Sequence, residues 1–409
     1  MHLHVVGIDA PVRSAAGVAM AGAIALAIGL GIGRFAFTPL LPMMQADAGV
    51  TILSGSWLAA ANYAGYLVGA LAGVRWQLAS PAVIRAGLIA VAATTFGMGV
   101  TNDYLIWLLL RAVAGAATAW ILVATSAWTL ATLAATGHAH LSSVVFSGVG
   151  LGIAVAGAFV LAAMAAGHTS SETWVALGLV ALVITATTWN TLLRDAGNGR
   201  LVQRAAAPVR WNASRGSGRT LLLVTCYGIF GFGYIIPATF LPAAARQIVA
   251  DPLVFGLSWP LFGLAGAVSA LVIGRLARNW TDRTTWIGGY IVLAVGVAVP
   301  ALSDSIAALF VSALAVGGTF MVITMAGLSE ARSLAGPGAA RLIAAMTAAF
   351  ATGQVLGPLV AAYFVRVQGT FAPALLSASA LLIACAAVLI WDARHASAMP
   401  AMSERGSST

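Results

Sequence analysis

The chain has 409 residues, of which 61% are hydrophobic and only 8% are charged, and its formal net charge is +9. Soluble globular proteins carry about 25% charged residues, so this composition excludes a soluble protein and predicts an all-helical membrane protein. The two cysteines, Cys226 and Cys385, offer neither a disulfide framework nor the spacing of a metal site. We therefore expect no metal and no cofactor.

Twelve apolar segments are long enough to cross the hydrocarbon core of a bilayer as helices. The first runs on through Pro42 and is followed by equally apolar segments, so we interpret it as a retained helix, not a cleaved leader. The longest connection, after residue 194, predicts an N-terminal six-helix bundle (1–194), a basic cytoplasmic linker (195–219) and a C-terminal six-helix bundle (220–409). The expected spans are 16–38, 55–75, 83–101, 104–128, 141–166, 173–193, 220–242, 255–274, 285–302, 305–328, 341–364 and 371–391.

The arginines predict the orientation of these spans, because cytoplasmic loops of membrane proteins are enriched in basic residues. With both termini cytoplasmic, sixteen of the twenty arginines fall on the inner side, and the outer loops hold only Arg246 and Arg366. The positive charge is thus a topology signal and does not indicate nucleic-acid binding. We expect a multi-pass protein of the bacterial inner membrane.

The two halves of the chain share a repeated stretch. Residues 31–42 (GIGRFAFTPLLP) recur as residues 231–242 (GFGYIIPATFLP), with Tyr234 in the place of Arg34. Shorter matches follow at similar offsets, such as Thr118 with Thr319 and residues 147–152 with 352–357. Six spans per unit predict parallel repeats, related by an axis along the membrane normal.

Twelve spans in two parallel halves joined by a basic linker resemble the major facilitator superfamily of secondary transporters. Residues 31–42, together with residues 62–70 (NYAGYLVGA), resemble its bacterial YbfB/YjiJ-type branch. The resemblance implies alternating access, with the first, fourth, seventh and tenth helices lining a central cavity. The loop signature of the superfamily is degraded at residues 73–76, and Ile153 replaces the proline of the fifth-span antiporter pattern. These departures leave the antiporter subgroup unsupported.

The acidic residues and histidines all lie in tails, loops or near span ends. Proton relays inside membranes usually employ Asp, Glu or His in the interior. Their absence there favours facilitated diffusion, exchange or symport with a proton carried by the substrate. A co-transported proton stays open, with Asp103 or Glu330 as an interfacial carrier.

Two arginines, Arg34 and Arg111, are predicted inside spans, each roughly 12 Å below the outer end of its helix. An unpaired guanidinium at such depth costs at least about 2.5–3.5 kcal/mol. One interpretation is that both face a cavity and bind an anion, since their forked donors suit a carboxylate or phosphate. The other is that they snorkel or donate to backbone carbonyls freed near Pro39.

Other polar side chains complete the predicted substrate site. Thr118 follows Arg111 along one helical stripe. The second span offers Tyr66, the seventh offers Tyr227 and Tyr234, and the eleventh offers Gln354. Interhelical hydrogen bonding is an equal explanation for the tyrosines and Gln354, and the preferred one for the threonine. Glycines and prolines of the repeat could form a paired outer gate, or the prolines could simply end the helices: Gly31, Gly33, Pro39, Pro42, Gly231, Gly233, Pro237 and Pro242.

These features predict a monomeric secondary transporter that moves a small solute, an organic anion, through the lipid bilayer. The alternative within transport is an efflux permease for amphipathic or cationic compounds. A channel would show a ring of like residues or a filter loop, and a sensor would carry a soluble domain; neither is visible. An enzyme is not expected, because the chain lacks buried acids, a metal cluster and a nucleophile with a base.

Overall fold

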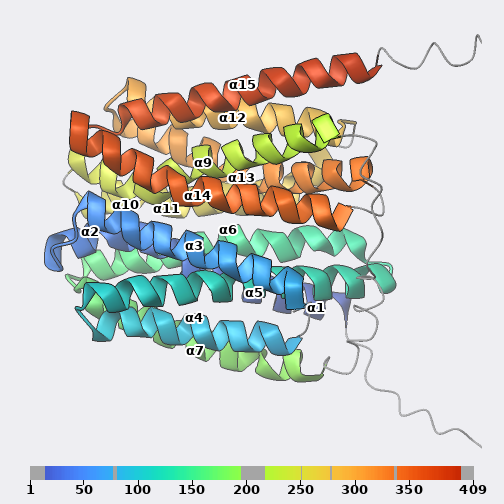
Figure 1. Cartoon of the computed structure of the whole chain (residues 1–409). Coiled ribbons are helices and arrows are strands. Elements are labelled where there is room, and N and C mark those ends of the chain that lie inside the picture. The colour runs from blue at the N-terminus through green and yellow to red at the C-terminus, as the bar shows by residue number, and fades with distance from the viewer. Residues whose placement is uncertain are drawn as a thin grey trace, which may run out of the picture.

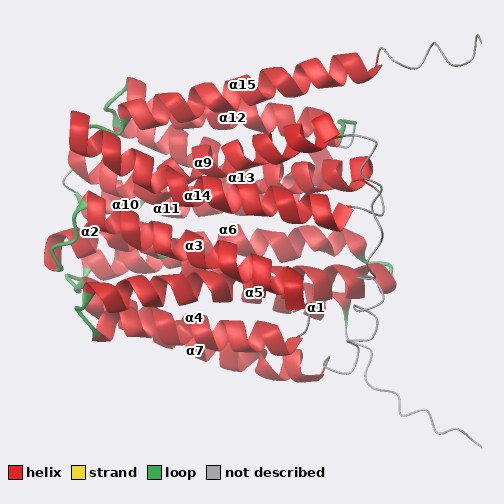
Figure 2. Ribbon diagram, viewed as in Figure 1, coloured by secondary structure: helices red, strands yellow, loops and turns green. Residues whose placement is uncertain are grey.

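The computed structural model describes residues 14–76, 81–194, 217–249, 251–276, 279–335 and 339–397. These residues form long, roughly parallel helices joined by short loops (Figures 1 and 2). Eleven helices of the described ranges are long and apolar enough to cross a membrane. The protein is therefore a multi-pass membrane protein. Most of the predicted linker 195–219 lies outside the described residues, as do both ends of the chain.

The first expected span is one helical rod of 33 residues, Ala15–Asp47, built from three pieces. These are α1 (Ala15–Leu26), a π-helix η1 (Ala27–Phe35) and α2 (Phe37–Asp47). The remainder of the first half consists of α3 (Ile52–Trp76), α4 (Pro81–Val100), α5 (Tyr104–Ala135), the short η2 (Ala139–Leu141), α6 (Ser142–Ala165) and α7 (Ser170–Arg194). The second half consists of α9 (Ser217–Ile248), α10 (Pro252–Gly256), α11 (Ser258–Leu276), α12 (Asp282–Leu302), α13 (Ile306–Ala335), α14 (Ala339–Gln368) and α15 (Ala372–Ser397).

Each expected span coincides with a helix, but α3 is not among the eleven candidate spans. This helix is 25 residues long, and polar side chains such as Ser56, Asn62 and Tyr66 interrupt its apolar sequence. The count of twelve membrane crossings therefore stays a prediction.

Several helices run further than expected. The first span was expected to end at residue 38, and α2 continues to Asp47, so Arg34 lies roughly 20 Å from that end of the rod. The fourth span was expected to end at residue 128, and α5 continues to Ala135. Its start at residue 104 was expected correctly. The carboxylate of Asp103 caps the helix there by accepting from the N–H of Leu105 at 2.8 Å.

The helices pair in the same order in each half of the chain. In the first half α3 packs on α5, α4 on α7, and α1 on α6. In the second half α11 packs on α13, α12 on α15, and α9 on α14. The halves meet where α6 packs on α11, α3 on α14, and α2 on α9 (Figure 1).

Glycines allow the closest of these approaches, as small residues do between membrane helices. A Cβ atom on Gly31 would lie 2.4 Å from the carbonyl carbon of Gly152 in α6. One on Gly231 would lie 2.2 Å from the carbonyl oxygen of Phe350 in α14. Gly31 and Gly231, which match in the repeated stretch, thus pack closely against α6 and α14.

The two ends of the bundle differ in their charges. We call them the Asp103 end, where α5 begins, and the Asp392 end, where α15 finishes. At the Asp392 end, Arg283 of α12 pairs with Glu330 of α13 at 2.7 Å and with Asp392 of α15 at 2.9 Å. Arg219 of α9 pairs with the same Asp392 at 3.0 Å. This ion-pair cluster joins four helices of the second half.

Candidate functional site

The π-helix η1 places Arg34 in an aromatic enclosure between helices. The side chain is only 3% exposed, and its guanidinium carbon lies 4.5 Å from the ring centre of Tyr66 and 4.9 Å from that of Tyr63. The ring of Phe35 is 5.4 Å away. Cation–π contacts of this kind are attractive, and more so when water is excluded. They leave the donor nitrogens free to bind something else.

Two of these nitrogens, Nε and Nη2 of Arg34, are buried and have no hydrogen-bond partner among the described residues. Buried polar groups in native proteins are nearly always hydrogen-bonded, so each exception requires an explanation. A guanidinium offers its donors in a fixed planar fork. Arg34 therefore presents unused, directed donors and a positive charge in the interior of the bundle.

Arg111 has a different environment, although it is equally buried at 2% exposure. Its three nitrogens donate to backbone carbonyls: Nε to Leu58 at 3.4 Å, Nη1 to Gly33 at 3.4 Å, and Nη2 to Arg34 at 3.3 Å. Two of these carbonyls, those of Gly33 and Arg34, lie where η1 changes to α2, shortly before Pro39. Arg111 thus donates hydrogen bonds to backbone carbonyls, two of them near Pro39.

Asn62 and Thr118 reinforce the same junction. The amide nitrogen of Asn62 donates to the carbonyl oxygens of Gly33 and Arg111, at 3.4 and 3.0 Å. The hydroxyl of Thr118 lies 3.0 Å from the carbonyl oxygen of Gly29 in η1. These bonds and those of Arg111 hold η1 against α3 and α5. The turn that carries Arg34 is therefore fixed by its neighbouring helices.

Across the interface, the second half contributes Tyr234 and Gln354, both fully buried. The Nε2 group of Gln354 donates to the hydroxyl of Tyr234. The ring of Tyr234 stacks between Phe350 at 5.6 Å and Phe320 at 6.1 Å. The Oε1 atom of Gln354 has no hydrogen-bond partner in the described part of the chain. This half therefore offers an aromatic stack with one unused polar acceptor.

The two half-sites face each other. The ring of Phe35, next to Arg34, contacts the ring of Phe320 at 6.5 Å, and the ring of Phe320 stacks on that of Tyr234. The ring of Tyr227 packs on the ring of Phe350, which in turn stacks on Tyr234. The rings of Phe35 and Phe320 thus connect Arg34 with the pair Tyr234 and Gln354. Arg111 and Thr118 instead bond to the backbone of η1.

Sequence reasoning offered Tyr66 as a cavity-facing residue of the second span but left Tyr63 out. Their three-residue spacing in α3 places them on one helical face, and both rings contact the same guanidinium. That spacing could have predicted that Tyr63 and Tyr66 contact the same group. The stacking rings of Phe320 and Phe350 carried no such signal, because phenylalanine is common in any apolar helix.

The halves are bonded to each other toward the Asp103 end. Within the described residues, three hydrogen bonds cross between them: Thr38 Oγ1 to the Ala238 carbonyl at 2.8 Å, Tyr63 to Thr239 at 3.1 Å, and Arg246 to the Pro42 carbonyl. These bonds hold α2 and α3 against α9 at this end of the bundle.

The prolines of the repeat explain one of these bonds. The helices do not end at them, since α2 continues to Asp47 and α9 to Ile248; helix termination is therefore the wrong explanation. Pro242 has no N–H, so the carbonyl four residues earlier, that of Ala238, lacks its helical partner. That carbonyl accepts the hydroxyl of Thr38 from the other half.

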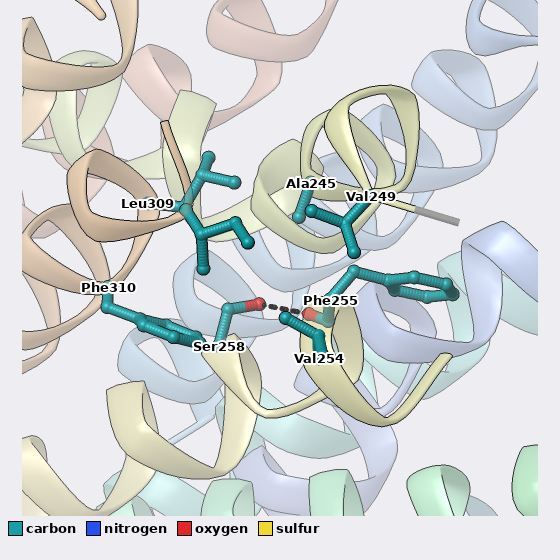
Figure 3. Close-up of a pocket in the computed structure, with 8 residues that line it drawn as sticks. Ala245, Val249, Val254, Phe255, Ser258, Leu309 and Phe310 are labelled. Atoms are coloured by element: carbon teal, nitrogen blue, oxygen red, sulfur yellow. Dashed lines mark hydrogen bonds between the residues drawn. The ribbon is translucent and has the colours of Figure 1, made fainter. Parts of the chain in front are cut away.

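A small hollow near the Asp103 end is unlike this site. It lies between α9, α10, α11 and α13, and its lining is apolar apart from Ser258 (Figure 3). The Ser258 hydroxyl already donates to the carbonyl of Phe255 at 2.8 Å. The hollow therefore offers no unused polar group to a solute.

This fold has solved counterparts. The structure of a mutant of the nucleoside transporter NupG matches with a TM-score of 0.64, covering 91% of this chain and 99% of that one, at 13% sequence identity. The likeness shows that this chain shares the fold of that transporter.

The sequence comparisons identify the family. Residues 26–390 match the family described as "Uncharacterised MFS-type transporter YbfB", so the chain belongs to this family of MFS-type transporters and is not an enzyme. The "Uncharacterized MFS-type transporter YdeG" of Bacillus subtilis (strain 168) is 31% identical over 181 residues, a match that spans 41% of each chain.

Proposed function

We propose that the protein is a secondary transporter that carries a small organic anion by alternating access. The main support for an anionic substrate is the buried guanidinium of Arg34, whose Nε and Nη2 atoms have no partner in the described part of the chain. The described carboxylates, such as Asp103 and Asp392, lie near the ends of their helices, whereas Arg34 lies in the interior of its helical rod. A carboxylate on the substrate is the group that complements these donors.

The energetics support this choice. A guanidinium at membrane depth costs at least about 2.5–3.5 kcal/mol, and cation–π contacts return about 2 kcal/mol when desolvated. A charge-assisted, two-pronged hydrogen bond to a planar anion would compensate the remainder. Arg111 already donates to three carbonyls, so its part in the site is to fix η1 and to add positive potential.

The proposed cycle separates the two halves at alternate ends. The common order of helix packing in each half supports two six-helix repeats, 1–194 and 220–409, joined by the linker 195–219. The positive-inside bias supports both termini in the cytoplasm of a bacterial inner-membrane protein, so the Asp103 end faces outward. The cross-half bonds at that end then close the outer side, with Pro42 and Pro242 within this gate.

Proton coupling through a buried carboxylate is not part of this proposal. The carboxylates of Glu330 and Asp392 form ion pairs with Arg283 and Arg219, which favours a role in holding helices together. We propose a monomer that works by exchange, facilitated diffusion or symport with a proton carried on the substrate.

The aromatic stack supports a second candidate. Phe320, Tyr234 and Phe350 present flat apolar faces, which would suit an amphipathic ring compound, and the structural counterpart NupG is a nucleoside transporter. Efflux of a neutral planar compound would use this stack and the Oε1 atom of Gln354. Cationic compounds fit poorly, because Arg34 would repel them.

A thermal-shift screen of the purified protein separates these candidates. Each small carboxylate in the panel is paired with its neutral amide and with a cationic analogue of the same ring or chain. We expect a carboxylate to stabilise the wild type, its amide to do so weakly, and neither to stabilise Arg34→Gln. Stabilisation by neutral or cationic partners, retained in Arg34→Gln, would contradict the anion proposal and favour efflux of planar compounds.

A further inference from the structure

A groove of about 350 Å³ opens on the outer surface of the second half, away from the interface between the halves. It lies between α11 and α12, both of which pack on α13, and residues of α13 form its floor. Its lining is almost entirely apolar, and its rim includes Val268 and Val292, which are 56% and 48% exposed. The groove is separate from the Arg34 site.

The groove runs along the helices through one half of the membrane thickness. On α11 it extends from Ala265 to Ile273, a rise of roughly 12 Å. Ala265 lies near the middle of its span, and Ile273 lies close to the Asp392 end. Trp280, which is 58% exposed, stands at that end of the groove, where tryptophan typically marks the membrane–water interface. The groove thus begins at the interface and ends near the bilayer centre.

Two glycines keep the groove open without serving helix packing. A Cβ atom on Gly318 would meet nothing closer than 3.9 Å, and one on Gly288 nothing closer than 4.0 Å. The packing glycines of this protein differ, since a Cβ on Gly317, the neighbour of Gly318, would lie 2.2 Å from a backbone oxygen. A larger residue would fit at positions 288 and 318, and it would fill the groove.

The groove is continuous with the lipid-facing surface of the spanning helices. Around it, Leu264, Leu271 and Val295 expose 44–53% of their surface on the same helices. An empty groove would leave its walls without contacts, and its apolar lining offers water few hydrogen-bond partners. A flexible apolar chain that enters from the interface and lies parallel to the helices fits both the shape and the chemistry.

We propose that this groove binds one acyl chain of a phospholipid in the leaflet at the Asp392 end. The chain lies along α11 and α12 over Gly288 and Gly318, with its headgroup near Trp280. Because lipid tails are as apolar as leucine side chains, its preference for the groove comes from close packing against the walls, not from the hydrophobic effect. The site is independent of the substrate that the transporter carries.

The test uses nanodiscs of phosphatidylethanolamine and phosphatidylglycerol that contain a phospholipid with a photoreactive diazirine in its acyl chain. After irradiation, the adducts are mapped by peptide mass spectrometry. We expect them to concentrate on α11 and α12 around Val268 and Val292, above their level on the exposed face of α15. They should be lost from the groove in Gly288→Leu/Gly318→Leu, and retained in Gly218→Leu, where an open glycine outside the groove is filled.

In the wild type alone, adducts spread evenly over all lipid-facing helices would overturn the proposal. So would groove adducts that persist unchanged in the folded double variant. Displacement of the groove adducts by a compound that the thermal-shift screen identifies as substrate would also overturn it, because the groove would then belong to the transport path.

Discussion

Replacing Thr38 with valine should weaken the closure of the Asp103 end. The substitution keeps the shape of the side chain and removes the hydroxyl that donates to the Ala238 carbonyl at 2.8 Å. Because Pro242 leaves this carbonyl without a helical partner, the variant exposes an unpaired acceptor at the interface between the halves. The closed state loses one of the three described hydrogen bonds that join α2 and α3 to α9.

The size of the effect follows from the worth of one such bond. Side-chain hydrogen bonds between membrane helices average about 0.6 kcal/mol, which corresponds to roughly a threefold shift toward the state open at the Asp103 end. Adding Thr239→Val, which removes the bond to Tyr63, should bring the shift to roughly eightfold if the two bonds are independent.

The assay is the labelling rate of a cysteine introduced at Ala238, which is fully buried in α9 and whose carbonyl accepts the Thr38 hydroxyl across this interface. The native Cys226 and Cys385 are buried and provide a low background. Thr94→Val is the matched control, because the Thr94 hydroxyl bonds only within its own helix. An unchanged labelling rate in the double variant would refute the closure of this end by these bonds.

Three further predictions concern the supports of the site. Arg111→Gln should destabilise the purified protein by about 1–3 kcal/mol, because three buried carbonyls each lose a donor; thermal unfolding measures this, and a fully stable variant would refute the supporting role. Gly31→Val should abolish folded protein in size-exclusion profiles, since its Cβ would overlap the backbone of Gly152; a normal profile would contradict the close crossing. Asp392→Asn should lower the melting temperature by several degrees, as Arg219 and Arg283 lose their shared partner, whereas Glu172→Gln on the exposed surface should not; equal melting temperatures would refute the cluster.

Much of the fold could be predicted from the sequence, because apolar length alone indicates a membrane-spanning helix. The start of α5 at Tyr104 was predicted correctly from the apolar run, and the structure shows that Asp103 caps it. The helix ends beyond Pro42 and Pro242 were not, because a proline read alone signals an end, whereas neighbouring helices can satisfy the backbone groups it frees.

The site was only partly predictable, for a related reason. The presence of Arg34 and Arg111 inside spans was evident, but their different environments depend on η1. A π-helix inserts an extra residue into a turn, and no periodicity in the glycine-rich residues 27–35 indicated where it would begin. Only the folded junction at Ala36 shows why Arg111 finds carbonyl partners and Arg34 does not.

The claim that Arg34 binds the transported anion is tested most directly by uptake into proteoliposomes. The probe is the carboxylate that gives the largest thermal shift, and the proteins are the wild type, Arg34→Lys and Arg34→Gln. Lysine keeps the charge and loses the planar fork, so we predict reduced uptake with lysine and none above protein-free liposomes with glutamine. Uptake by Arg34→Gln at the wild-type rate would contradict the account.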